Sequence, residues 1–180
     1  MALEKLSVVV PCYNEEETIR LFLTESQLVE SKMKQGVIFD YIFVNDGSTD
    51  KTLEVLRQVS KEFDNVHYLS FSRNFGKEAA LLAGLEAADG DFVTVMDVDL
   101  QDPPEMLLDM YQKIKEGYDV VGTRRSDRKG EPALRSIFSK LFYKMINSVS
   151  DTELLDGTRD FRLMTRQVVA NILRLNEVNR

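Results

Sequence analysis

The sequence predicts an α/β fold, in which a mainly parallel, Rossmann-like sheet carries helices on both faces. Short β-rich runs alternate along the chain with longer segments of helical periodicity. Alternation at this spacing is typical of βαβ units, which build parallel sheets. The length of 180 residues fits one domain, and no repeat, low-complexity stretch or long linker divides the chain.

Five strands are expected, because five short apolar runs are each followed by polar residues. The first lies at residues 6–10 and consists mainly of valine. The remaining four are expected at residues 41–44, 66–71, 92–96 and 119–122.

Helices are expected at residues 15–34, 52–63 and 77–88, then from Pro103 onward, and finally at residues 134–148. The apolar residues whose spacing supports the first two helices are Ile19, Phe22, Leu23 and Leu28, then Leu53, Leu56, Val59 and Phe63. Gly90 is expected to stop the third helix. The Asp-Pro-Pro-Glu segment at residues 102–105 is expected to open the fourth with an acidic cap.

Composition and charge exclude several classes of protein. With 43% hydrophobic and 29% charged residues, the chain is globular rather than disordered, collagen-like or coiled-coil. A single cysteine excludes an intrachain disulfide, and with a single histidine it excludes a zinc site of the Cys/His kind. Any metal is therefore held by oxygen atoms, as Mg²⁺, Mn²⁺ or Ca²⁺ would be. The net charge of −7 argues against a nucleic-acid partner.

The charge is distributed unevenly along the chain. Residues 124–144 contain seven Lys or Arg and two acidic residues, which suggests a second kind of partner surface. Apolar residues recur at helical spacing over residues 134–149, where they either pack on the sheet or place a helix near a membrane surface. The sequence shows no secretory signal, and none of its apolar runs approaches the ~20 residues that a membrane helix needs. The chain as given is therefore expected to be soluble.

A polar cluster follows each expected strand, at residues 11–15, 45–50, 72–76, 97–101 and 122–125. Ligands of open α/β sheets bind beyond the carboxyl ends of the strands. Five clusters on one rim therefore predict one binding site.

The cluster after the fourth strand has the character of a metal site. Asp97 and Asp99 are two residues apart and can turn toward the same region, where two like charges are unfavourable unless a cation offsets them. With Gln101 they offer three oxygen ligands, which suits Mg²⁺ or Mn²⁺ bridging phosphate oxygens. The alternative is a solvated acidic turn ahead of the next helix.

The cluster after the second strand also has two interpretations. Asp46 either accepts hydrogen bonds from a nucleobase or is an ordinary turn residue. Neither a G-x-G-x-x-G nor a P-loop motif is present. Phosphates would therefore be bound by metal and by basic side chains, for which Arg73, Lys77 and Arg124 are the candidates on the rim.

Two chemically reactive residue types are assigned no role in catalysis. His67 is interpreted as a packed or surface histidine. Cys12 is interpreted as a small residue that fills space beside the site, since no histidine base is adjacent to it.

Together the segments VVVPCYNEEETI, VNDGSTDKT, SFSRNFGKEAALLAGLEAADGD and VMDVDLQDPPE resemble the family 2 glycosyltransferases, which have the GT-A fold. The resemblance covers nearly the whole chain. It is strongest to the polyprenyl-phosphate branch, typified by dolichyl-phosphate mannose synthases and bactoprenol glucosyltransferases. Members of that branch usually continue into membrane helices, so residues 1–180 resemble a single catalytic domain cut from a longer protein.

The resemblance implies a role for individual residues. Those matching the nucleotide-sugar site are Pro11, Tyr13, Glu15, Val44, Asp46, Lys77, Asp97 and Val98. Those matching the acceptor-phosphate site are Arg124, Arg135 and Ser139, and those matching the metal site are Asp99 and Gln101. The catalytic set comprises Asp97, Asp99, Arg124 and Asp160, although the late segment 156–162 leaves both Asp156 and Asp160 as candidates for the functional acid.

The implied reaction is the inverting, Mg²⁺- or Mn²⁺-dependent transfer of a sugar from a UDP- or GDP-linked donor to a polyprenyl phosphate. It implies work at the cytoplasmic face of a membrane, in the synthesis of cell-envelope glycans, and is compatible with a homo-oligomer. Two alternatives stay open: a non-catalytic module that binds a nucleotide sugar or a lipid head group, and a metal-dependent phosphohydrolase.

Overall fold

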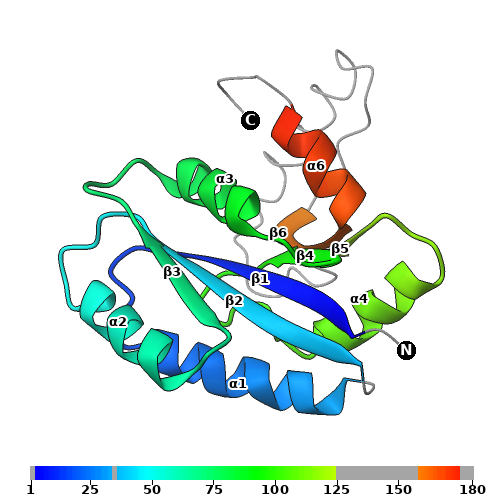
Figure 1. Ribbon diagram of the computed structural model, residues 1–180, viewed down its shortest axis with the longest axis horizontal. Helices are drawn as coiled ribbons and strands as arrows, with labels where there is room; N and C mark the ends of the chain where they lie inside the picture. The colour runs from blue at the N-terminus through cyan, green and yellow to red at the C-terminus, as the bar shows by residue number, and fades with distance from the viewer. Residues whose placement is uncertain (1–2, 34–35, 125–157, 175–180) are drawn as a thin grey trace, which may run out of the picture. The chain divides into compact units, whose positions relative to one another are not determined.

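The computed structural model describes residues 3–33, 36–124 and 158–174 (Figure 1). The expected helix at residues 134–148, together with Arg135, Ser139 and Asp156, lies outside the described residues. The chain divides into two compact units, one formed by residues 1–121 and 161–180 and the other by residues 122–160. The candidate site described below belongs to the first unit.

The strands form a six-stranded sheet in the order β3-β2-β1-β4-β6-β5. Their bounds are Glu4–Cys12 for β1, Val37–Asn45 for β2, Val66–Ser70 for β3, Phe92–Val95 for β4, Val120–Arg124 for β5 and Thr158–Thr165 for β6. Strand β1 pairs in parallel with β2 and β4, and β2 pairs in parallel with β3, whereas β6 runs antiparallel to β4. The predicted α/β fold with a mainly parallel sheet is therefore confirmed.

Helices cover both faces of the sheet (Figure 1). On one face lie α1 (Ile19–Lys32), α2 (Thr52–Glu62) and α4 (Met106–Lys115), and on the other α3 (Lys77–Ala87) and α6 (Arg166–Arg174). The two faces carry separate hydrophobic clusters, because side chains alternate along β1: Val8 and Val10 face the first group of helices and Val9 faces the second. Among the described residues, none of the helices combines the length and apolar character needed to cross a membrane.

Gly84 sets the distance between α3 and the sheet. A Cβ at this position would lie 2.3 Å from Cγ1 of Val9 and 3.3 Å from Cγ2 of Val44. The absence of a side chain therefore lets α3 lie close against β1 and β2, which brings the amino-terminal end of the helix to the carboxyl ends of these strands.

Several details differ from the sequence-based expectations. Helix α1 begins at Ile19 rather than near residue 15, and Leu28 is 49% exposed while Ser26 and Val29 are buried. Helix α4 begins at Met106 rather than at Pro103, and Glu105 at its N-cap position makes no capping hydrogen bond through its side chain. Strand β6 and helix α6 were not predicted.

Gly90 does not act as the expected helix stop. Helix α3 already ends at Ala87, and Gly90 lies where a Cβ would be only 2.8 Å from the backbone oxygens of Lys5 and Phe92. Its role is to let two backbone segments approach closely, and not to adopt a left-handed conformation at the helix end.

Candidate functional site

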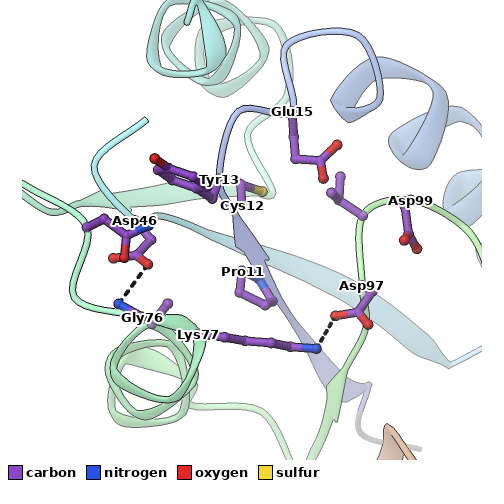
Figure 2. Close-up of a pocket in the computed structure, with 12 residues that line it drawn as sticks. Pro11, Cys12, Tyr13, Glu15, Asp46, Gly76, Lys77, Asp97 and Asp99 are labelled. Carbon is purple, nitrogen blue, oxygen red and sulfur yellow. Dashed lines mark hydrogen bonds and ion pairs between the residues drawn. The ribbon is translucent and has the colours of Figure 1, made fainter. Parts of the chain in front are cut away.

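A pocket of about 310 Å³ lies beyond the carboxyl ends of β1, β2 and β4 (Figure 2). Its lining residues come from four segments far apart in the sequence: Pro11, Cys12, Tyr13, Glu15, Asp46, Asn74, Gly76, Lys77, Ala80, Asp97, Val98 and Asp99. This is the rim at which open α/β sheets bind ligands, and the volume is sufficient for a small molecule.

The loops that follow β1 and β2 hold each other in place through hydrogen bonds. The Asn14 backbone N–H donates to Oγ of Ser48 over 3.0 Å, and in return the Thr49 backbone N–H donates to Oδ1 of Asn14 over 2.9 Å. The Glu15 N–H donates to Oγ1 of Thr52 over 2.7 Å. These reciprocal bonds fix the wall of the pocket that the loops after β1 and β2 form, before any ligand binds.

Asp46 is buried, with 4% of its surface exposed, and its carboxylate joins two parts of the site. Oδ1 accepts a hydrogen bond from the Phe75 backbone N–H over 2.7 Å, and Oδ2 accepts one from the Gly76 N–H over 2.9 Å. Each carboxylate oxygen can accept a further bond, so this arrangement leaves capacity for a ligand. Asp46 thus has a structural role that the sequence did not reveal.

Gly47 explains why the loop after β2 can pack so closely on the loop after β3. It has a φ of +63°, and a Cβ would lie 2.2 Å from the carbonyl carbon of Arg73 and 2.5 Å from the Asn74 nitrogen. Both the conformation and the contact with backbone require glycine here.

The acidic pair after β4 is held in two different ways. Lys77, the first residue of α3, forms a 2.7 Å ion pair between its Nζ and Oδ1 of Asp97 (Figure 2). Asp99 accepts hydrogen bonds from Gln101, from the backbone N–H over 3.1 Å and from Nε2 over 2.7 Å. Both carboxylates line the pocket, on the segment that follows β4 (Figure 2).

The donor set of this cluster fits Mg²⁺ or Mn²⁺ in chemical type, because carboxylate and amide oxygens are the ligands that these ions take. Its number of ligands is small. The described residues contain no group of three or more His, Cys, Asp or Glu side chains placed to hold a metal ion. A metal here would need further oxygen ligands from a bound diphosphate.

Cys12 lines the pocket as a buried residue, whereas His67 lies outside it. Burial raises the pKa of the Cys12 thiol, with a smaller contribution from the Glu15 carboxylate, so the thiol stays protonated and non-nucleophilic at neutral pH. His67 contacts Asp40 over 3.1 Å in a separate cluster with Lys5. Neither His67 nor Asp40 lines the pocket.

The structure gathers eight of the predicted nucleotide- and metal-site residues in the pocket lining: Pro11, Tyr13, Glu15, Asp46, Lys77, Asp97, Val98 and Asp99. Gln101 lies beside them through Asp99, whereas Val44 is buried in β2 against α3. Arg73, a candidate phosphate ligand, does not line the pocket, and its guanidinium lies 4.7 Å from the centre of the Phe75 ring.

The remaining predicted residues belong to other parts of the chain. Asp160 is exposed in β6 within the second unit, and Arg124 ends β5. Asn74, Gly76 and Ala80 line the pocket without having been assigned roles. Asn74 and Gly76 belonged to the polar cluster at residues 72–76. Ala80 follows Gly76 by one helical turn, and this spacing was the sequence signal that could have placed Ala80 at the site.

Residues 7–173 match the family described as glycosyl transferase family 2. The chain belongs to this family. It is 44% identical over 177 residues to a putative glycosyltransferase, CsbB, of Bacillus subtilis (strain 168), a match that covers 97% of this chain and 52% of that protein. It is 43% identical over 176 residues to a bactoprenol glucosyl transferase of Shigella phage SfV, covering 97% and 56% respectively. The chain thus spans about half the length of these relatives.

The solved structures confirm the GT-A type of fold. A mannosyltransferase of Pyrobaculum calidifontis, PcManGT, in complex with GDP-Man and Mn²⁺, matches with a TM-score of 0.64 at 18% identity. The match covers 96% of this chain and 47% of that one. At this identity the likeness concerns the fold alone.

Proposed function

We propose that this family 2 chain transfers a sugar, with inversion, from a nucleotide diphosphate sugar to a polyprenyl phosphate at the cytoplasmic face of a membrane. The observation that carries the proposal is the pocket at the carboxyl ends of β1, β2 and β4, which Asp97 and Asp99 both line and in which the ammonium of Lys77 pairs with Asp97. The 43% identity to a protein named bactoprenol glucosyl transferase supports the choice of acceptor.

The nucleotide would bind along the wall formed by the loops after β1 and β2. Tyr13 is 47% exposed at the pocket and offers an aromatic face for a base, while Asp46 offers the unused acceptor capacity of its buried carboxylate. Because the loops are already fixed by hydrogen bonds, little conformational entropy is lost when the base and ribose bind. UDP and GDP are both candidates.

The diphosphate would lie next to the acidic pair. Asp99 and Gln101, with Asp97, are the residues that would hold Mg²⁺ or Mn²⁺, and the ion would supply Lewis-acid stabilisation of the leaving diphosphate. The side chains of Asp99 and Gln101 are both exposed and are joined by a hydrogen bond from the Gln101 amide to the Asp99 carboxylate. Because both are exposed, the two side chains can turn toward a ligand together. Lys77 reaches from the first turn of α3 and places its positive charge beside Asp97 (Figure 2).

The acceptor needs little activation in this mechanism. A phosphate monoester is largely ionised near neutral pH and is already a nucleophile. Asp160 is therefore proposed to orient the acceptor or the sugar rather than to remove a proton. A true general base contributes about 10²–10⁴-fold. Asp160→Asn should consequently lower the transfer rate by less than this range, and a loss within it would establish Asp160 as a base.

The test is to incubate the protein with UDP-glucose or GDP-mannose, Mn²⁺ and a polyprenyl phosphate, and to analyse the products. Formation of a glycolipid is the expected result. Binding of the donor without turnover would instead identify a non-catalytic binding module, and free sugar with phosphate would identify a hydrolase. The control is Lys113→Met, which removes a surface ion pair with Glu116 on α4 and should leave transfer unchanged.

A binding measurement tests the role of Asp46. Asp46→Ala should weaken nucleotide binding by about 1.5–3 kcal/mol, the usual contribution of a hydrogen bond to a charged group. Calorimetry that shows equal affinity in the variant would leave Asp46 with only its structural bonds to Phe75 and Gly76.

A further inference from the structure

The charges that line the pocket are unbalanced. Four carboxylates, those of Glu15, Asp46, Asp97 and Asp99, face one ammonium, that of Lys77, among the lining residues. The structure gives three of the carboxylates uncharged partners: Glu15 accepts from the Thr18 hydroxyl over 2.7 Å, Asp46 from two backbone N–H groups, and Asp99 from Gln101. Asp97 is the carboxylate that Lys77 neutralises, over 2.7 Å.

Lys77 combines a fixed backbone with a movable charged end. Its preceding residue, Gly76, is bound through its N–H to the buried Asp46, and the first turn of α3 follows directly. The lysine side chain is a flexible four-carbon chain that ends in a compact charge. With 41% of its side chain exposed, and 43% of that of Asp97, the pair is open to solvent, so separating it requires little free energy.

These observations lead to an exchange of partners. Resting on the proposed function, we propose that Lys77 neutralises Asp97 until a nucleotide binds, and then moves to the diphosphate and leaves Asp97 available to the divalent cation. A diphosphate carries more negative charge than a carboxylate and attracts the ammonium more strongly at equal distance. Once the ammonium leaves, Asp97 and Asp99 are two uncompensated carboxylates, and a divalent cation then offsets both.

The exchange predicts effects of opposite sign for one substitution. Lys77→Met removes the ammonium while keeping an unbranched side chain that is only one atom shorter. Asp97 is then uncompensated in the free protein, so Mn²⁺ added alone should bind about tenfold more tightly than to the wild type. UDP or GDP added without metal should bind about tenfold to a hundredfold more weakly, because a charge-assisted contact to phosphate is lost.

A double variant locates the source of the gain. In Lys77→Met/Asp97→Asn no charge on residue 97 is released, so the tighter binding of Mn²⁺ should disappear. Lys77→Arg keeps the charge and should stay near the wild type for Mn²⁺. Lys113→Met, which removes a similar 2.8 Å ion pair on α4, is the matched control and should change neither affinity.

The coupling between metal and nucleotide provides a second readout. Coupling free energies are reciprocal, so the factor by which UDP tightens Mn²⁺ binding equals the factor by which Mn²⁺ tightens UDP binding. In Lys77→Met the gain in Mn²⁺ affinity is already partly present without nucleotide. The factor by which UDP tightens Mn²⁺ binding should therefore fall about tenfold. A lysine with a merely structural role would weaken both ligands or neither and would leave their coupling unchanged.

Isothermal titration calorimetry of Mn²⁺ alone, UDP alone and the two together measures all three quantities. Tighter Mn²⁺ with weaker UDP supports the exchange, and unchanged or weaker Mn²⁺ binding in Lys77→Met overturns it. The two proposals fail differently. These binding changes without glycolipid formation would overturn the proposed function alone, whereas normal transfer without a gain in Mn²⁺ affinity would overturn the exchange alone.

Discussion

At the amino end of β1 each of the carboxylates of Glu4, Asp40 and Asp89 has a lysine partner, whereas at its carboxyl end one lysine contacts only one of the four carboxylates that line the pocket. Near the amino end, Glu4 accepts hydrogen bonds from Lys115 and Tyr111, and Lys5 pairs with Asp89 over 2.6 Å. The partners shift one another's ionisation: the Lys115 and Tyr111 contacts lower the pKa of Glu4, and Asp89 raises the pKa of Lys5. At the carboxyl end, one lysine faces the four carboxylates of the pocket lining.

From this difference we infer that the matched charges serve the fold and that the unmatched carboxylates serve a ligand. Charges matched within the fold lower its free energy and should affect stability when removed. Like charges left close together raise its free energy, so they are expected where a ligand completes the balance. The predictions for Asp99 and Glu4 test this division, and those for Gly47 and Tyr41 test a backbone contact and a buried polar group of the same fold.

The largest expected effect concerns Asp99. Asp99→Asn should lower the transfer rate about 10²–10³-fold, the size of effect seen when a group that stabilises transition-state charge is removed. The free energy of unfolding should not fall, because the substitution removes a like charge next to Asp97 and an amide can still accept from Gln101. Glycolipid formation and urea unfolding measure the two quantities. A parallel loss of stability would place Asp99 among the charges that serve the fold.

A second prediction concerns the backbone that supports the carboxyl-end site. Gly47→Ala should lower the free energy of unfolding by about 3 kcal/mol, since a Cβ would meet the Arg73 backbone and φ is positive. The matched control is Gly117→Ala, where φ is also positive (+105°) but nothing lies within 4 Å of the added atom. It should cost about 1–2 kcal/mol. Equal losses would show that conformation, not the loop contact, requires Gly47.

The third prediction concerns pH and the amino-end cluster. Because the folded-state pKa of Glu4 is lowered from its ordinary value of 4.5, the unfolded chain takes up a proton first as pH falls. The contribution of Glu4 to stability is therefore fully present above pH 4.5 and is lost as pH falls through the lowered value. Glu4→Gln should lower stability at pH 7 by less than about 1 kcal/mol, since the cluster is partly exposed. The difference from wild type should vanish in strong acid, as followed by urea unfolding across pH.

The smallest effect is expected from a buried polar group in β2, the hydroxyl of Tyr41. Tyr41 is fully buried beneath α1, and its hydroxyl has no hydrogen-bond partner in the described part of the chain. Removing a buried, unpaired hydroxyl relieves its desolvation cost. Tyr41→Phe should leave stability unchanged or raise it by up to about 1 kcal/mol in thermal unfolding. A loss of stability would mean that a hydrogen bond forms there in solution.

Local sequence patterns predicted most of the parallel core and most of the pocket. The valine-rich run of β1 and the polar clusters after β1, β2 and β4 are local features, and parallel pairing brings such strand ends to one rim. Asp97 and Asp99 were found for this reason. The roles of Arg135 and Ser139 stay predictions, because these residues lie outside the described part of the chain.

Strand β6 and helix α6 were missed because their pattern is ambiguous. Residues 158–165 mix charged and apolar side chains, and the strand is buried on both faces: Phe161 and Leu163 lie in one hydrophobic cluster and Met164 in the other. Its antiparallel pairing with β4 brings together residues about 70 positions apart in sequence, and no local signal specifies such a contact.

The sequence by itself determined the order of strands β1 to β5 and helices α1 to α4, the turn residues and the chemical types on the rim, because these depend on periodicity and on nearby residues. Only the tertiary structure decided which side chains meet. Packing set the rotation of α1, which buries Ser26 and exposes Leu28, and the close contact at Gly84 placed α3 beside β1. Lys77 and Asp97 are joined because β4 pairs with β1 beneath that helix. Contacts of this kind depend on the geometry of the packed layers, which no local stretch of sequence encodes.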